Sequence, residues 1–135
     1  MRELKLDEAR LDRLDEVVAF VDGLLEEMDC PMKTQMQIDL AVEEVFVNIV
    51  HYAYAPGTGP VGIRVEAEPE RVAAITFVDQ GLPYDPLARP DPDITLSAEK
   101  RRIGGLGIYM VKKSMDDMAY RREGDSNVLT IRKRV

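Results

Sequence analysis

The chain has 135 residues, enough for one domain with a buried core, and its 45% hydrophobic and 32% charged residues are ordinary for a globular protein. A net charge of −7 argues against binding to a nucleic-acid backbone, which needs a basic surface. No stretch approaches the roughly 18 apolar residues of a membrane span, the N-terminal residues lack a signal-peptide core, and Cys30 is the only cysteine. We therefore expect residues 1–135 to form a single domain of a cytoplasmic protein.

The N-terminal part predicts a short strand followed by two helices. Residues 3–6 alternate as an edge strand would, and apolar residues then recur at helical spacing from about Arg10 to Met28. A second helix is predicted from about Lys33 to Ala53, and the turn residues "APGTGP" at 55–60 end it. The apolar stripe of this second helix comprises Ile38, Ala41, Val42, Val45, Ile49 and Tyr52.

The C-terminal part predicts four strands, one helix and a long loop. The segments are a strand over 61–67, a more apolar partner strand over 71–78, a helix from about Leu106 to Ser114, and two closing strands over 117–123 and 128–134. Residues 82–103 contain four prolines and show no period, and loops of this length are usually functional or disordered. Together the segments predict a two-layer α/β sandwich, in which three helices cover one face of a mixed, mostly antiparallel sheet.

Three polar side chains share one face of the second predicted helix. Glu44, Asn48 and His51 are spaced i, i+4 and i+7 at the edge of the apolar stripe, whereas Glu43 points away. A carboxylate can accept a proton, and an amide oxygen one turn away suits Mg²⁺, which takes oxygen ligands and keeps several waters. The alternative is a solvated helix edge. For His51, a partly buried helix side chain is favoured over a contact with phosphate.

The apolar strand over 71–78 ends in a carboxylate that a rigid turn follows. In "DQGLPYDP", Asp79 stands at the strand end, where its oxygen can accept from the exocyclic amino group of an adenine. Gly81 permits a close backbone approach, and Pro83 and Pro86 restrict the chain on either side. The alternative is an ordinary Asp-x-Gly turn at the end of a strand.

A glycine cluster, "GGLG", precedes and enters the third predicted helix. It consists of Gly104, Gly105, Leu106 and Gly107. The unpaired N–H groups and the positive dipole end of a helix start bind anions, and glycines let a phosphate chain approach the backbone. The pattern is neither G-x-G-x-x-G nor a P-loop. The alternative is a glycine hinge between loop and helix.

The order of these motifs resembles the gyrase, histidine-kinase and MutL (GHKL) ATPase superfamily, whose nucleotide pocket is called the Bergerat fold. The helix motif is similar to the N box of that superfamily, the Asp-x-Gly turn to its first G box, and the glycine cluster to its second. The loop between them, about 82–105, resembles the ATP lid. "EEVFVN", "DQGLPYDP" and "GGLGIYMVKK" are further similar to the anti-sigma factor serine kinases of bacterial partner-switching systems.

The resemblance implies a role for each matching residue. Glu44 would be the general base, and Asn48 would bind Mg²⁺. Asp79 would accept from the adenine amino group, with Gly81 and Pro83 in the turn next to the base. The backbone of Gly104, Gly105, Leu106 and Gly107 would contact the phosphates of ATP.

The chain departs from the family pattern at two places. The family often has Gly-Thr on the last strand, where this chain has Ser126 and Asn127, so Asn127 is expected to back the adenine instead. Kinase members commonly carry an arginine on the first helix near the transferred phosphate. Arg10 and Arg13 are the candidates here, and the cations Lys100, Arg101 and Arg102 of the lid are an alternative. The resemblance thus implies ATP binding more directly than phosphoryl transfer.

The function implied by the resemblance is that of an Mg²⁺- and ATP-dependent serine/threonine kinase. Its substrate would be a STAS-type anti-sigma factor antagonist. A sigma factor would compete with this antagonist for binding to the kinase. The resemblance also implies that the kinase can form a homodimer. Three alternatives stay open. They are an ATP-gated binding module without catalysis, an ATP hydrolase without a protein acceptor, and an inactive scaffold.

Overall fold

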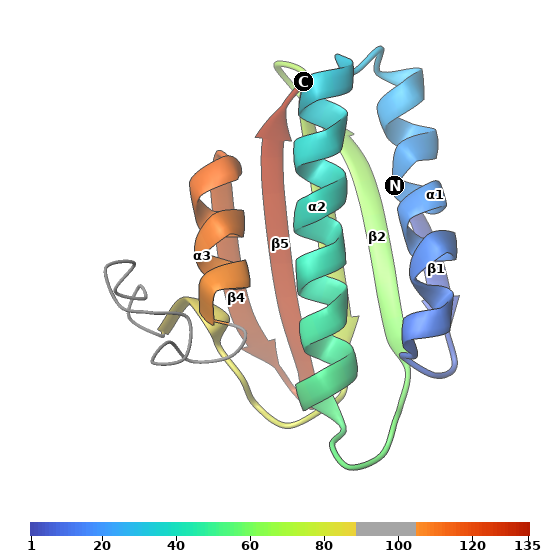
Figure 1. The fold of residues 1–135 in the computed structure, drawn as a ribbon, viewed down its shortest axis with the longest axis vertical. Coiled ribbons are helices and arrows are strands. Elements are labelled where there is room, and N and C mark those ends of the chain that lie inside the picture. The colour runs from blue at the N-terminus through green and yellow to red at the C-terminus, as the bar shows by residue number, and fades with distance from the viewer. Residues whose placement is uncertain (89–104) are drawn as a thin grey trace.

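The computed structural model describes residues 1–88 and 105–135, and within these ranges three α-helices cover one face of a five-stranded sheet (Figure 1). The predicted α/β sandwich is therefore confirmed. The elements in chain order are β1 (Arg2–Leu6), the 3-10 turn η1 (Leu11–Arg13), α1 (Leu14–Glu27), α2 (Met32–Asn48), the π-helical turn η2 (Ile49–Ala53), β2 (Val61–Glu68), β3 (Val72–Asp79), the 3-10 turn η3 (Pro86–Ala88), α3 (Gly105–Ser114), β4 (Asp117–Glu123) and β5 (Ser126–Arg134).

The strands lie in the order β1-β2-β3-β5-β4. Every neighbouring pair in this order is antiparallel, whereas the sequence predicted a mixed, mostly antiparallel sheet. β5 begins at Ser126, two residues before its predicted start, because Gly124 turns the chain at a φ of 59° and the ladder continues to the pair Glu123 and Ser126. Among the described helices none is long and apolar enough to cross a membrane.

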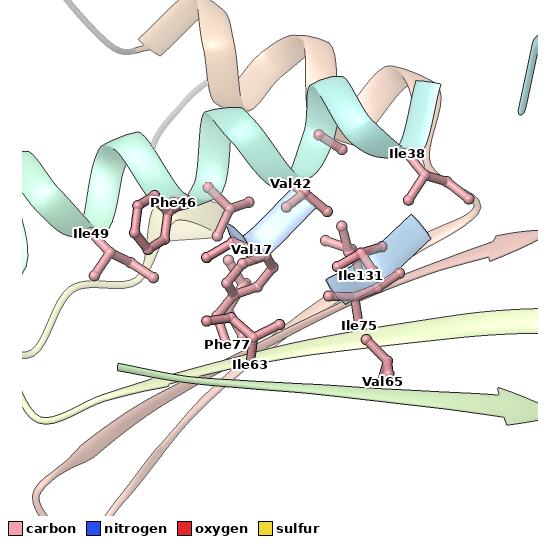
Figure 2. Close-up of a cluster of buried hydrophobic side chains, with 14 of the residues drawn as sticks. Val17, Ile38, Val42, Phe46, Ile49, Ile63, Val65, Ile75, Phe77 and Ile131 are labelled. Carbon is pink, nitrogen blue, oxygen red and sulfur yellow. The ribbon is translucent and has the colours of Figure 1, made fainter. Parts of the chain in front are cut away.

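The hydrophobic core fills the space between the helices and the sheet (Figure 2). Strand residues alternate between the two faces of a sheet, so every second side chain of β2, β3 and β5 points toward α2. The removal of these apolar side chains from water is the main favourable term in the folding of such a layer. The labelled members of the cluster are Val17, Ile38, Val42, Phe46, Ile49, Ile63, Val65, Ile75, Phe77 and Ile131.

The end of the second predicted helix departs from α-helical geometry. Ile49–Ala53 forms a π-helical turn, whose wider i to i+5 hydrogen bonding rotates each following side chain away from its α-helical position. Tyr52, predicted on the buried stripe, is therefore 38% exposed, and Ala53 is buried. His51, predicted to be partly buried, is exposed, so that prediction was wrong.

Helices α1 and α2 hold two carboxyl groups next to each other. Asp22 Oδ1 on α1 and Asp39 Oδ1 on α2 are buried and have no hydrogen-bond donor in the described part of the chain. Asp15 and Glu43 line the same groove, and among the residues that the structure describes no basic side chain lines it. Burial raises the pKa of Asp39 to about 7, and a hydrogen bond and the charge of Asp22 add to this rise. A proton shared between the two carboxyl groups satisfies the pair.

Asp39→Asn should reduce the loss of stability with rising pH. The pKa of Asp39 rises from 3.8 to about 7 on folding, so the folded state holds this proton more tightly. The resulting stabilisation is complete below about pH 4 and is lost as the pH rises through about 7. Since asparagine keeps a donor at every pH, the urea midpoint of the variant should exceed that of the wild type above about pH 7, where folded Asp39 loses its proton.

The control is Glu43→Gln, which removes one exposed negative charge from the same helix and groove. Its urea midpoint should keep the pH dependence of the wild type. Equal pH slopes for the wild type and Asp39→Asn would contradict the shared proton.

Candidate functional site

The apolar ladder between β3 and β5 ends in a polar pair. Phe77 and Leu129 face each other across the two strands, and the period of two places Asp79 and Asn127 next in line on the same helix-facing side. Both polar residues are buried, with 6% and 5% of their surface exposed. The packing of the core therefore aims a carboxylate and an amide at the end of α2.

The Asn127 amide uses its donors and acceptor in four hydrogen bonds. Its Nδ2 donates to Asp79 Oδ1 at 2.9 Å and to the Leu82 carbonyl at 2.8 Å. Its Oδ1 accepts from the Tyr84 N–H at 3.2 Å and from the Tyr120 hydroxyl at 2.6 Å. Asn127 thus holds both the carboxylate and the loop that follows it.

Asp79 keeps one carboxylate oxygen for another donor. The N–H of Gly81 also donates to Asp79 Oδ1, at 2.9 Å, so both hydrogen bonds from described residues end on the same oxygen. Such a turn, in which the side chain of Asp binds the backbone two residues on, fixes the direction of the carboxylate. Among the described residues, no hydrogen bond ends on Oδ2.

The turn after Asp79 packs directly on η2. A Cβ added to Gly81 would lie 2.2 Å from the Ala53 carbonyl oxygen, and the Leu82 N–H donates to the same oxygen at 3.0 Å. The Tyr54 hydroxyl accepts from the Gln80 N–H at 2.6 Å and donates to the Pro60 carbonyl. Gly81 is therefore required by a close backbone approach.

A pocket lies among the end of α2, η2 and the ends of β3 and β5. It brings together three predicted site residues, Asn48, Asp79 and Asn127. The rings of Tyr52 and Tyr84 stack beside them, with centroids 6.2 Å apart and planes 23° apart. A mainly apolar pocket with a few convergent polar groups is typical of a small-molecule site. The remaining lining residues are Val45, Ile49, Ala53, Phe77, Pro86, Ile108, Tyr120 and Leu129.

The predicted base, Glu44, lies against the first turn of α3. A Cβ added to Gly107 would lie 2.1 Å from Glu44 Oε2 and 2.9 Å from its Cδ, so the carboxylate contacts the backbone of Gly107. Because Glu44 precedes Asn48 by one helical turn, both side chains project from the same side of α2. Glu43 is exposed on another side, as predicted, and lines the groove toward α1.

The other residues of the predicted site lie apart from this pocket or outside the described residues. Gly81 and Pro83 line a neighbouring groove with Arg122, whose guanidinium donates to the Gly81 carbonyl at 2.8 Å. Gly105 and Leu106 begin α3. Gly104, the cations Lys100, Arg101 and Arg102, and most of the predicted lid fall within 89–104, which the structure does not describe.

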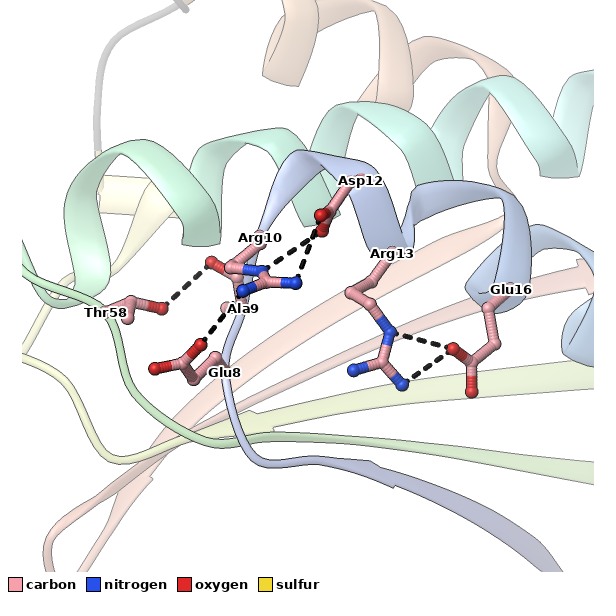
Figure 3. A network of polar contacts seen from close by, with 7 residues as sticks. All are labelled: Glu8, Ala9, Arg10, Asp12, Arg13, Glu16 and Thr58. Atoms are coloured by element: carbon pink, nitrogen blue, oxygen red, sulfur yellow. Dashed lines mark hydrogen bonds and ion pairs between the residues drawn. The ribbon is translucent and has the colours of Figure 1, made fainter.

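The two candidate arginines near the first helix bind carboxylates of their own segment (Figure 3). Arg10 contacts Asp12 at 3.1 Å and Glu8 at 3.3 Å, and Arg13 contacts Glu16 at 2.7 Å. Neither arginine lines the pocket. For Arg10 or Arg13 to bind phosphate, its guanidinium would have to leave these exposed ion pairs, which are weak.

Sequence reasoning missed the three tyrosines of the pocket. Tyr84 stands inside the quoted turn motif, and an aromatic residue held between two prolines was a usable signal. Tyr52 was assigned to the core because an unbroken α-helix was assumed. Tyr120 reaches the site only through the pairing of β4 with β5, which one strand pattern cannot reveal.

Comparisons with known proteins identify the family to which the chain belongs. The model of the histidine kinase-like ATPase domain matches residues 8–133, so the chain belongs to this family, and the predicted resemblance to GHKL ATPase domains is confirmed. The serine/threonine-protein kinase BtrW of Bordetella bronchiseptica is 27% identical over 100 residues, which are 73% of this chain and 70% of that protein.

Two solved structures share the fold at low sequence identity. The RsbU and RsbW domains of Rv1364c from Mycobacterium tuberculosis match 99% of this chain and 32% of that chain, with a TM-score of 0.63 and 14% identity. The SiaB–SiaC complex from Pseudomonas aeruginosa matches 96% of this chain and 88% of that chain, with a TM-score of 0.60 and 12% identity. The pocket described above is therefore placed in an ATPase-type domain.

Gly81→Ala should destabilise the fold, because the new Cβ would meet backbone atoms of Ala53 that cannot move aside as a side chain could. We expect a loss of about 1–3 kcal/mol in the free energy of unfolding, measured by urea denaturation. The matched control is Gly23→Ala in α1, where nothing lies within 4 Å of the new Cβ. That change should stabilise the protein by about 0.5–1 kcal/mol. A neutral Gly81→Ala would contradict the close contact.

Asn127→Asp should destabilise the protein at neutral pH and less so at acidic pH. The substitution replaces the donor that reaches Asp79 Oδ1 and the Leu82 carbonyl with an acceptor. The expected loss in the free energy of unfolding is about 2–4 kcal/mol at pH 7. The loss should be smaller at acidic pH, where Asp79 or the new carboxyl group at position 127 binds a proton. Asn48→Asp, in the same pocket, is the control and should cost less. Equal losses at both positions would argue against the Asn127 network.

Proposed function

We propose that this chain is a protein kinase that transfers the γ-phosphoryl group of ATP to a serine or threonine of a STAS-type anti-sigma factor antagonist. The observation that carries the proposal is the convergence of Asn48, Asp79 and Asn127 in one pocket of a histidine kinase-like ATPase domain. The similarity to a serine/threonine kinase supports the class of acceptor. The complex formed by SiaB, which shares the fold, supports a protein partner.

Recognition of adenine falls to Asp79 in this proposal. Its Oδ2 would accept a hydrogen bond from the exocyclic amino group, while guanine would present a carbonyl oxygen there and leave two acceptors facing each other. Asn127 and Gly81 keep the carboxylate in place by their hydrogen bonds to Oδ1. Tyr52 and Tyr84 provide aromatic surface beside the base.

Asn48 fits a magnesium ligand. Its half-buried amide lines the pocket, and an amide oxygen is a ligand type that Mg²⁺ accepts together with water and substrate phosphates. When bound, the metal supplies positive charge that neutralises the phosphate oxygens. The backbone N–H groups at the start of α3, from Gly105 to Gly107, would hold the phosphates by the helix dipole.

Glu44 would accept the proton of the attacking hydroxyl. In the proposed transfer, the serine or threonine oxygen forms a bond to the γ-phosphorus, the bond from this phosphorus to the bridging oxygen breaks, and ADP leaves. The hydroxyl proton passes to the Glu44 carboxylate. Competition between the antagonist and a sigma factor for this protein would then regulate transcription.

The proposal is tested with γ-labelled ATP, Mg²⁺ and a STAS-type antagonist. Label on a serine or threonine of the antagonist is expected, whereas release of free phosphate alone would indicate a hydrolase, and ATP binding without either product would indicate a binding module. Thermal melting with ATP, ADP and GTP, each with and without Mg²⁺, measures recognition separately. Asp79→Asn should weaken ATP binding on the order of 10- to 100-fold, as expected for a lost hydrogen bond to a charged group.

A further inference from the structure

Glu44 contacts the place where the proposed function puts phosphate. Its Oε2, Cδ and Cγ would lie 2.1, 2.9 and 3.7 Å from a Cβ on Gly107, so the carboxylate is the part of the side chain nearest to the backbone. Gly107 is the third residue of α3. The first four N–H groups of a helix have no acceptor within the helix, and the dipole there favours a negative charge. The Glu44 carboxylate thus lies beside the Cα of Gly107, within the first turn of α3, whose N–H groups have no acceptor in the helix.

We propose that the Glu44 carboxylate and the terminal phosphate of the nucleotide compete for the start of α3, so that Glu44 lowers the affinity for triphosphate. This inference rests on the proposed function. Two anions at contact distance repel each other, and a phosphate that approaches Gly107 meets the carboxylate. The group at the contact is the far end of a half-buried, flexible side chain, so it moves aside without a change in the backbone.

The competition gives Glu44 a second role besides that of proton acceptor. A carboxylate displaced from α3 by the γ-phosphate becomes available to the attacking hydroxyl only when a triphosphate is bound. A diphosphate reaches less far along the pocket and displaces the carboxylate less. Glu44 would therefore set the balance between ATP and ADP, and Asp79, fixed by Asn127 and Gly81, would not take part in it.

The test compares nucleotide affinities of Glu44→Gln and Glu44→Ala with those of the wild type. Binding of a non-hydrolysable ATP analogue, ADP and adenosine is measured by calorimetry with Mg²⁺ present. Both variants should bind the triphosphate analogue on the order of tenfold more tightly, the scale of one relieved like-charge contact near a protein surface. The gain should be smaller for ADP and absent for adenosine.

Glu43→Gln is the matched control, because Glu43 is the adjacent residue on α2, carries the same charge and is exposed in the groove toward α1. Its affinities should equal those of the wild type. Unchanged triphosphate affinity in both Glu44 variants, or an equal gain for adenosine, would overturn the competition while leaving the proposed kinase intact. Absence of nucleotide binding in every protein would overturn both. The isosteric Glu44→Gln keeps the test valid if Glu44→Ala folds poorly.

Discussion

The register between β3 and β5 is the constraint on which the candidate site depends. A shift of one residue would turn Asp79 or Asn127 to the other face of the sheet and separate the carboxylate from the amide. The register is held by buried pairs such as Phe77 with Leu129, whose burial would also be lost in such a shift. The precision of the polar site is therefore supplied by the hydrophobic core beneath it.

A second constraint joins the helix motif to the aspartate turn. The π-helical turn at the end of α2 presents the Ala53 carbonyl to the Leu82 N–H, and only glycine at position 81 allows the two backbones to come this close. The Tyr54 hydroxyl adds a hydrogen bond to the same turn, and burial raises the pKa of Tyr54, which keeps the hydroxyl neutral. Motifs from two distant segments consequently behave as one unit.

The amino-acid sequence predicted the elements and the order of the motifs, because helical and strand periods and turn residues are local signals. It also predicted that Asn48, Asp79 and Asn127 belong to one site, through the family resemblance. It could not predict the π-helical turn or its packing against Gly81, which joins two segments distant in the sequence. Nor could it predict the contact of Glu44 with Gly107, because this contact exists only once α2 and α3 pack together.

Asp79 and Glu44 carry the same chemical group in two different settings, and this difference accounts for their separate roles in the proposed function. Asp79 is buried, and two hydrogen bonds on one oxygen fix its direction, as recognition of a base requires. Glu44 is half-buried at the end of a long side chain and contacts a glycine, so it can be displaced. A proton acceptor that must meet an incoming hydroxyl needs a mobile carboxylate. A residue that distinguishes adenine from guanine needs a fixed carboxylate, because a mobile one would lose its selectivity.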